Sequence, residues 1–166
     1  MKINLKYLFA FILMNLSISI FGQTHLLSNE TLIFSFKTGK DKIVTLAKDK
    51  NNEYIIYRFG AKDNIEFEFP DKSKKSWEKF KYYHYSRGGG KQNLAENLSG
   101  VSFVNKDFEY RLYDSYSSES DEYEIGVLIL NLKTKKTTNI KGKLKSKKGA
   151  LNGFDGSNLL EIDDEI

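Results

Sequence analysis

Residues 54–69 read Tyr-Ile-Ile-Tyr-Arg-Phe-Gly-Ala-Lys-Asp-Asn-Ile-Glu-Phe-Glu-Phe, and this stretch decides the fold class. Its first six residues are rich in the β-branched and aromatic side chains that strands favour. In residues 65–69 apolar and acidic side chains alternate with a period of two, which indicates a strand with one buried face. Pro70 ends this strand because proline cannot donate a ladder hydrogen bond. The polar residues between the two segments predict a turn.

Similar patterning continues along the chain and predicts about nine strands at hairpin-like spacing. This spacing favours an all-β fold, a single antiparallel β-sandwich or barrel, over β-α-β units. No strong amphipathic helix is present, and residues 93–97 are expected to form at most one helical turn. Gly126 lies inside a predicted strand and indicates either a bulge or a close approach of another group. The other predicted strands cover residues 32–36, 44–46, 80–86, 101–104, 108–116, 123–132 and 137–143.

Residues 1–22 have the pattern of a secretory signal peptide. Lys2 and Lys6 precede a short apolar run, and small residues follow it. The run is too short to span a bilayer, which needs roughly 20 residues, although a buried N-terminal helix or strand is the alternative. No cysteine follows the run, so no lipoprotein anchor is expected. We therefore expect residues 23–166 to be a single β-rich domain with a short acidic C-terminal tail. It would be exported, soluble, periplasmic or extracellular, and without a transmembrane segment.

The composition argues against most catalytic and metal chemistry. The chain has no cysteine, which excludes disulfides, Cys-ligated zinc, iron–sulfur clusters and a cysteine nucleophile. Two histidines are too few for a His-rich metal site, so no metal and no cofactor are expected. The formal net charge is only +4 over 166 residues, and no nucleic-acid partner is expected. Glu66 and Glu68 resemble the carboxylate pair of a glycosidase, but a solvated strand face explains them better.

The segment 77–93 is the most unusual part of the chain. It contains the only tryptophan, three tyrosines, one histidine and one arginine, followed by three glycines. Exposed Trp, Tyr and Arg anchor protein interfaces, and aromatic rings also stack on sugars. The glycines permit a turn that lets a partner approach the backbone. The competing interpretation is a long hairpin whose aromatic residues cover the sheet. The candidate binding residues are Trp77, Tyr82, Tyr83, His84, Tyr85, Arg87, Gly88, Gly89 and Gly90.

The chain has 26 Lys and Arg residues, and only three of them are arginines. Guanidinium offers five fixed donors and bidentate pairing, which an ammonium group lacks. Because Arg58 and Arg111 fall in the middle of predicted strands, we expect them to make structural ion pairs or to line a pocket. Arg87 is expected to be exposed in its loop. The candidate acidic partners are Glu66, Glu68, Glu109 and Asp114.

Several short motifs resemble an uncharacterised family of small exported bacterial β-rich proteins. The motifs are Tyr-Arg-Phe-Gly at 57–60, Ile-Glu-Phe-Glu-Phe-Pro at 65–70, Ser-Trp at 76–77, Arg-Gly-Gly-Gly at 87–90 and Tyr-Arg-Leu-Tyr-Asp at 110–114. The resemblance covers roughly residues 31 to 145. It implies an exported β fold and carries no activity with it.

These observations lead to three functional hypotheses. The first is a non-enzymatic binding protein of the bacterial periplasm or cell surface, of the inhibitor or immunity type, whose partner is another protein. The second is a carbohydrate-binding domain in which Trp77 and the tyrosines stack on sugar rings. The third and weakest is a cell-wall glycan hydrolase that uses Glu66 and Glu68.

Overall fold

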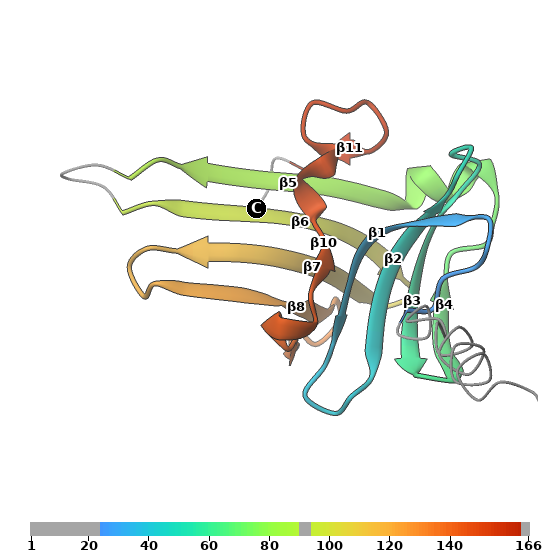
Figure 1. The fold of residues 1–166 in the computed structure, drawn as a ribbon, viewed down its shortest axis with the longest axis horizontal. Coiled ribbons are helices and arrows are strands. Elements are labelled where there is room, and N and C mark those ends of the chain that lie inside the picture. Colours follow the sequence, from blue (N-terminus) through green and yellow to red (C-terminus); the bar gives the residue numbers. More distant parts are fainter. Residues whose placement is uncertain (1–23, 90–93, 164–166) are drawn as a thin grey trace, which may run out of the picture.

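The computed structural model describes residues 24–89 and 94–163, which form two sheets and a few short 3₁₀ helices (Figure 1). The all-β fold predicted from the alternation is confirmed. Of the two predicted alternatives, a sandwich and a barrel, the structure favours the sandwich, because the strands form two separate sheets rather than one closed barrel. The signal peptide predicted at residues 1–22 lies outside the described residues and stays a prediction.

The smaller sheet has five antiparallel strands in the order β10-β1-β2-β3-β4. The stretch that decided the fold class forms its β3–β4 hairpin, in which Arg58 lies opposite Glu68 and Tyr57 opposite Phe69. A short two-residue strand, β10, returns from the C-terminal part of the chain to pair with β1. The strands are β1 (Glu30–Lys37), β2 (Ile43–Asp49), β3 (Ile55–Ala61), β4 (Asn64–Phe69) and β10 (Lys148–Gly149).

The larger sheet has six strands in the order β11-β5-β6-β7-β8-β9. Strands β5 to β9 follow one another as an antiparallel meander, and β11 adds two residues parallel to β5. The strands are β5 (Phe80–Arg87), β6 (Glu96–Asn105), β7 (Phe108–Ser117), β8 (Glu122–Asn131), β9 (Thr137–Lys141) and β11 (Glu161–Ile162).

The helical turn expected at residues 93–97 is wrong for its described part. Glu96 and Asn97 already belong to β6, and Asn97 lies opposite both Ser86 and Tyr116. Neighbours on both sides provide the ladder hydrogen bonds, and this pairing outweighs the weak strand preference of polar residues.

The two sheets share one apolar core, and aromatic rings join them. The ring of Phe103 in the larger sheet stacks on Phe69 of the smaller sheet, with centroids 4.7 Å apart. The centroid of the Tyr57 ring lies 5.0 Å from that of Phe103. The ring of Tyr110, in the strand next to Phe103, stacks on Phe103 with centroids 4.8 Å apart. Figure 1 shows that the strands of the two sheets run at a steep angle to each other, as in orthogonal sheet packing. The smaller sheet therefore covers only one end of the longer strands.

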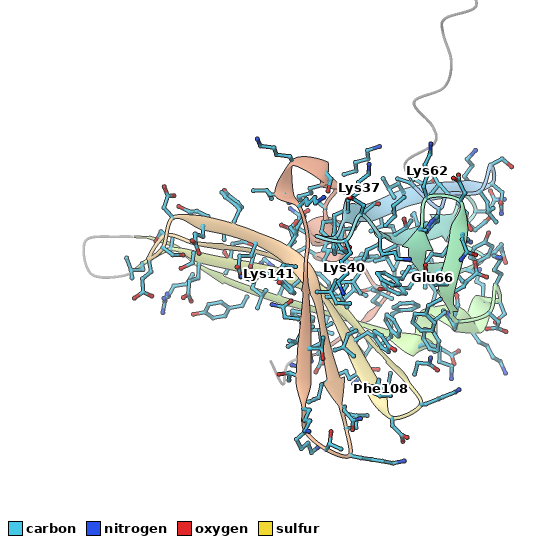
Figure 2. All side chains as sticks on the ribbon, turned by 90° about the horizontal axis from the view of Figure 1, so that it is seen from below. Lys37, Lys40, Lys62, Glu66, Phe108 and Lys141 are labelled. Atoms are coloured by element: carbon cyan, nitrogen blue, oxygen red, sulfur yellow. The ribbon has the colours of Figure 1, made fainter. Side chains whose placement is uncertain are left out.

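The other end of the larger sheet extends past the core. We call residues 85–89, 94–98 and 115–124 the projecting end; none of these described residues is buried. Figure 2 shows dense side chains between the sheets on one side of the molecule and a thin ribbon with side chains on both faces on the other. Successive residues of a strand point to opposite faces, so a sheet without a covering layer exposes both sets.

The outer face of the smaller sheet is covered by residues 24–29. Leu26 packs on Ala47, Tyr54 and Ile56, and the backbone oxygen of His25 accepts a 2.7 Å hydrogen bond from Arg58 Nη1. This segment closes the sheet face over a fully buried guanidinium.

Candidate functional site

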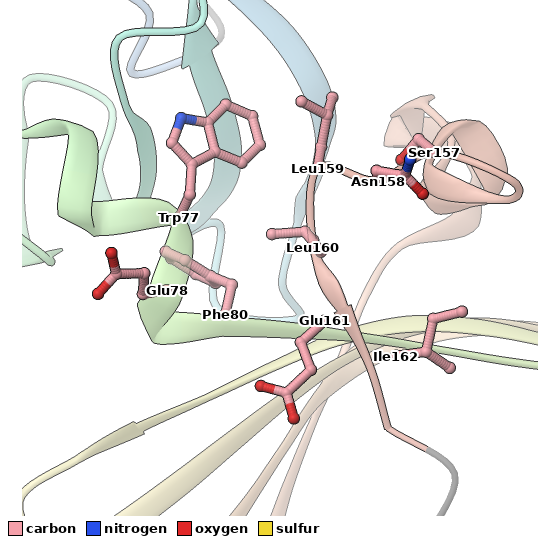
Figure 3. A pocket seen from close by; sticks show the side chains of 9 residues that line it. All are labelled: Trp77, Glu78, Phe80, Ser157, Asn158, Leu159, Leu160, Glu161 and Ile162. Atoms are coloured by element: carbon pink, nitrogen blue, oxygen red, sulfur yellow. The ribbon is translucent and has the colours of Figure 1, made fainter.

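Trp77 lies in the 3₁₀ helix η2 (Lys74–Lys79) and is half-buried against the core. Its indole Nε1 donates a 3.0 Å hydrogen bond to the backbone oxygen of Asn52. Figure 3 shows the ring facing Leu159 and Leu160 across a pocket of about 460 Å³. The hydrogen bond fixes the indole between the turn before β3 and the C-terminal segment, which gives Trp77 a structural role.

Tyr82 and Tyr83 were expected on a binding surface, and the structure places both in the interior. Their exposed fractions are 3% and 4%. Tyr82 faces the core between the sheets and contacts Phe154. Tyr83 points to the opposite face of the sheet, where its hydroxyl donates a 2.9 Å hydrogen bond to the backbone oxygen of Leu112. A partner at the surface does not reach either ring, so this part of the predicted site is wrong.

Tyr83 is buried on the outer face of the sheet, where its ring packs against Gly100. A Cβ added at Gly100 would overlap the ring. The same arrangement recurs two strands further on, where Tyr113 lies over Gly126 and its hydroxyl donates to Asn139 Oδ1 at 3.0 Å. Of the two alternatives for Gly126, the close approach is confirmed, since β7 and β8 pair without a register shift there.

The remaining predicted residues lie at or near the projecting end. His84 hydrogen-bonds through Nδ1 to Ser99 Oγ at 3.0 Å, and Tyr85 is 46% exposed. Arg87 is exposed, as expected, but it is the last residue of β5 rather than part of a loop, and it pairs with Glu96 at 3.2 Å. Gly88 and Gly89 are exposed after the end of β5, whereas Gly90 lies outside the described residues. The structure therefore separates Trp77 from the group that contains Tyr85 and Arg87.

A shallow groove of about 360 Å³ lies along the projecting end, on the face that points away from the core. Tyr85 and Leu98 pair across β5 and β6 and form its apolar floor. Glu96, Glu122 and Glu124 line its edges. Sequence reasoning found Tyr85 but missed Leu98 and the glutamates, because only the strand register brings residues so distant in sequence together.

Arg58 makes the most buried ion pair among the described residues. Its Nη1 and Nη2 donate to the two carboxylate oxygens of Glu30 at 2.6 and 2.7 Å, and its Nε donates to Glu68 at 2.6 Å. Glu68 was an expected partner; Glu30 was missed because it begins β1, far from the strands considered. Burial alone would raise the pKa of Glu30, but the hydrogen bonds from Arg58 and the backbone hold the pKa below its usual value.

Arg111 also forms a bidentate ion pair, with Glu109, and this pair is more exposed than that of Arg58. Its Nε donates to Glu109 Oε1 at 2.7 Å and its Nη2 to Glu109 Oε2 at 3.1 Å. The hydrogen bonds to Glu109 raise the pKa of the guanidinium. Both arginines therefore make the structural ion pairs that their positions in strands suggested.

The two glutamates of β4 lie in ion pairs. Glu66 pairs with Lys42, and Glu68 with Arg58 and Lys72. Burial would raise the pKa of Glu68, but the hydrogen bonds from Arg58 and Lys72 lower it. A carboxyl with a lowered pKa is ionised near neutral pH and is a poor general acid.

No group of three or more His, Cys, Asp or Glu residues is placed to hold a metal ion within residues 24–89 and 94–163. The helices of these same ranges are all too short or too polar to cross a membrane. No protein-family model, curated protein or solved structure matches the chain. The resemblance to an uncharacterised exported family therefore stays a prediction.

Proposed function

We propose that this chain is an exported, non-enzymatic binding protein whose partner is another protein, and that the outer groove of the projecting end is its contact surface. Export rests on the signal-peptide pattern of residues 1–22. The observation that carries the binding surface is the uncovered end of the larger sheet, where Tyr85 is 46% exposed and Leu98 lies beside it. Tyrosine is enriched at protein interfaces because it buries a large rigid ring and keeps a polar end.

The charge at the projecting end defines the kind of partner. Five acidic residues gather there, and Arg87 is the one basic residue among the described residues of the projecting end. An acidic surface attracts a basic one and accelerates its association. The partner therefore has a basic face with an apolar side chain at its centre. The acidic residues are Glu96, Glu119, Asp121, Glu122 and Glu124.

The strand edge beside this groove adds a second means of recognition. Strand β11 pairs with Lys81 and Tyr82 only, so no described strand covers the rest of that edge of β5. The unpaired backbone groups of an edge strand accept an extended segment of another chain.

The test begins with the exported protein as bait in an extract of the native cell envelope. The captured protein is then purified, and its affinity is measured by calorimetry. The double variant Tyr85→Ser, Glu122→Lys is expected to weaken binding at least roughly tenfold, since the central aromatic residue and the rim charge are both lost.

The matched control is Phe108→Ser, which removes a similarly exposed ring at the far end of β7 (Figure 2). It is expected to leave the affinity unchanged. Wild-type affinity in the double variant, or an equal loss in the control, would show that the partner binds elsewhere.

A further inference from the structure

The inner face of the projecting end holds a second groove that the protein-binding proposal does not use. The chain from η3 (Leu144–Ser146) through β10 to η4 (Leu151–Phe154) crosses the larger sheet at the point where the core ends (Figure 1). Between this crossing segment and the strands lies a groove of about 310 Å³. Its size is at the lower end of the range for small-molecule sites.

The crossing segment forms a fixed wall. The backbone nitrogen of Ala150 donates to Ile33 at 3.1 Å, and Ser146 Oγ accepts a 2.8 Å hydrogen bond from the backbone of Lys37. On the other side, Lys147 Nζ bonds Asp114 of β7 at 2.6 Å. These contacts attach the segment to both sheets, so the groove is formed before any ligand binds.

Two tyrosines provide an aromatic wall. Tyr116 of β7 and Tyr123 of β8 lie directly opposite each other, with ring centroids 4.4 Å apart. Tyr123 is 58% exposed, which is an unusually large exposed surface for an aromatic side chain. The rings pack against each other at an interplanar angle of 31°, and the exposed side of this pair is an apolar surface on which a planar or disc-shaped ligand packs.

The polar side chains of the groove carry no net charge together, and they offer groups for hydrogen bonding. Lys147 and Asp114 neutralise each other, with only 27% and 14% of their side chains exposed. The side-chain amides of Asn97 and Asn152 line the groove, and neither bonds to any described residue. Each amide offers both donors and an acceptor. Ser99 lies at the base, where its hydroxyl bonds His84.

We propose that this groove is a carbohydrate-binding site for a neutral sugar unit. A pyranose ring has an apolar face that packs on aromatic rings and an edge of hydroxyl groups that both donate and accept hydrogen bonds. The tyrosine pair matches the face, and Asn97 and Asn152 match the hydroxyl groups. An anionic ligand would leave its charge unpaired, because Lys147, the one ammonium group among the described residues of the groove, already bonds Asp114.

This inference goes beyond the proposed protein partner and rests mainly on the opposite face of the sheet, although Asn97 and Tyr116 line both grooves. Tyr116, Tyr123 and Asn97 point to the inner face, whereas Tyr85, Leu98 and Glu124 point to the outer face. Tyr123 lines only the inner groove and Tyr85 only the outer one, so variants at these two positions let the two proposals fail independently.

The experiment titrates the full exported protein with soluble tetrasaccharides of glucose and of N-acetylglucosamine. Binding is followed by calorimetry and by chemical-shift changes at the groove. We expect at least one sugar to bind with a millimolar or tighter dissociation constant. Tyr123→Ser is expected to weaken this binding roughly five- to tenfold because it removes half of the aromatic wall. Asn97→Ala is expected to weaken it roughly threefold or more through the lost hydrogen bonds.

Tyr85→Ser is the matched control, since it removes another exposed tyrosine from the outer face of the same sheet. It should bind the sugar like the wild type, and the unfolding temperatures of all three variants should confirm that they are folded. The proposal is overturned if neither tetrasaccharide binds at millimolar concentration. It is also overturned if Tyr123→Ser and Asn97→Ala bind as the wild type does, or if Tyr85→Ser loses as much affinity as they do.

Discussion

The outer face of the smaller sheet and the projecting end of the larger one contain similar residues in opposite environments. Both contain tyrosine, glutamate and one arginine. In the first region, Arg58 and Glu30 are buried, and Tyr54 donates a 2.9 Å hydrogen bond to the same carboxylate. In the second, Arg87 and Glu96 form a single exposed contact. The comparison teaches that coverage, rather than composition, separates a buried stabilising network from an exposed surface.

The difference has a simple structural cause. Residues 24–29 cross the outer face of the smaller sheet and hold its polar groups away from water, for example through the hydrogen bond from Arg58 to His25. Among the described residues, none lies over the projecting end in the same way. A buried charge must find partners, while an exposed one is free to exchange them.

The largest expected effect is at Arg58. Replacing it with alanine leaves the Glu30 carboxylate buried without its partner, and removal of one member of a buried pair costs about 3–5 kcal/mol. The free energy of unfolding from urea titration measures this loss. Arg111→Ala, which breaks a partly buried pair with Glu109, is the control and should cost clearly less, about 1 kcal/mol. Equal losses for the two variants would show that burial of the Arg58 network contributes nothing to stability.

The next effect is at the tyrosine–glycine contact. Gly100→Ala places a methyl group where the Tyr83 ring lies, so the ring must move and its hydrogen bond to Leu112 is lost. Overpacking of this kind costs about 1–3 kcal/mol. Gly88→Ala is the matched control, because no atom lies within 4 Å of the added Cβ. A thermal unfolding curve that is unchanged by Gly100→Ala would contradict the fixed position of the ring.

Acid should lower the free energy of unfolding by weakening the ion pairs of Arg58 with Glu30 and Glu68. Arg58 holds the folded-state pKa values of Glu30 and Glu68 below 4.5, the usual value for this carboxyl. The ionised carboxylates therefore stabilise the fold above pH 4.5, and this contribution is lost as the pH falls through that value toward the lower folded pKa values. Unfolding measured from neutral to acidic pH should show the decline. Glu68→Gln should make it shallower; an unchanged slope would assign the acid sensitivity to other groups.

The smallest effect on stability is expected in the projecting end. Tyr85→Ser removes a ring that is 46% exposed, so the free energy of unfolding should change by no more than about 0.5 kcal/mol. The same urea titration as for Arg58 measures it. A loss of several times that size would mean that the projecting end is part of the stabilising core.

The sequence predicted the strands well, because their alternation has a physical cause in the buried face. It also indicated that Arg58 and Arg111 form ion pairs, since an arginine in a lysine-rich chain points to a position that needs bidentate pairing. It could not distinguish Tyr82 and Tyr83 from Tyr85, because burial depends on where the smaller sheet ends and on Gly100, a residue of the next strand. The glutamates and Leu98 around Tyr85 were equally hidden, since the register of β5 to β8 brings them together.

Hydrogen–deuterium exchange, with and without the captured partner protein, tests the central claim most directly. The account predicts that backbone amides of residues 85–87, 96–98 and 115–124 become protected on binding. It predicts no change in the amides of β1 to β4 or around Trp77. Protection confined to the smaller sheet or to the Trp77 pocket, with none in the projecting end, would contradict the account.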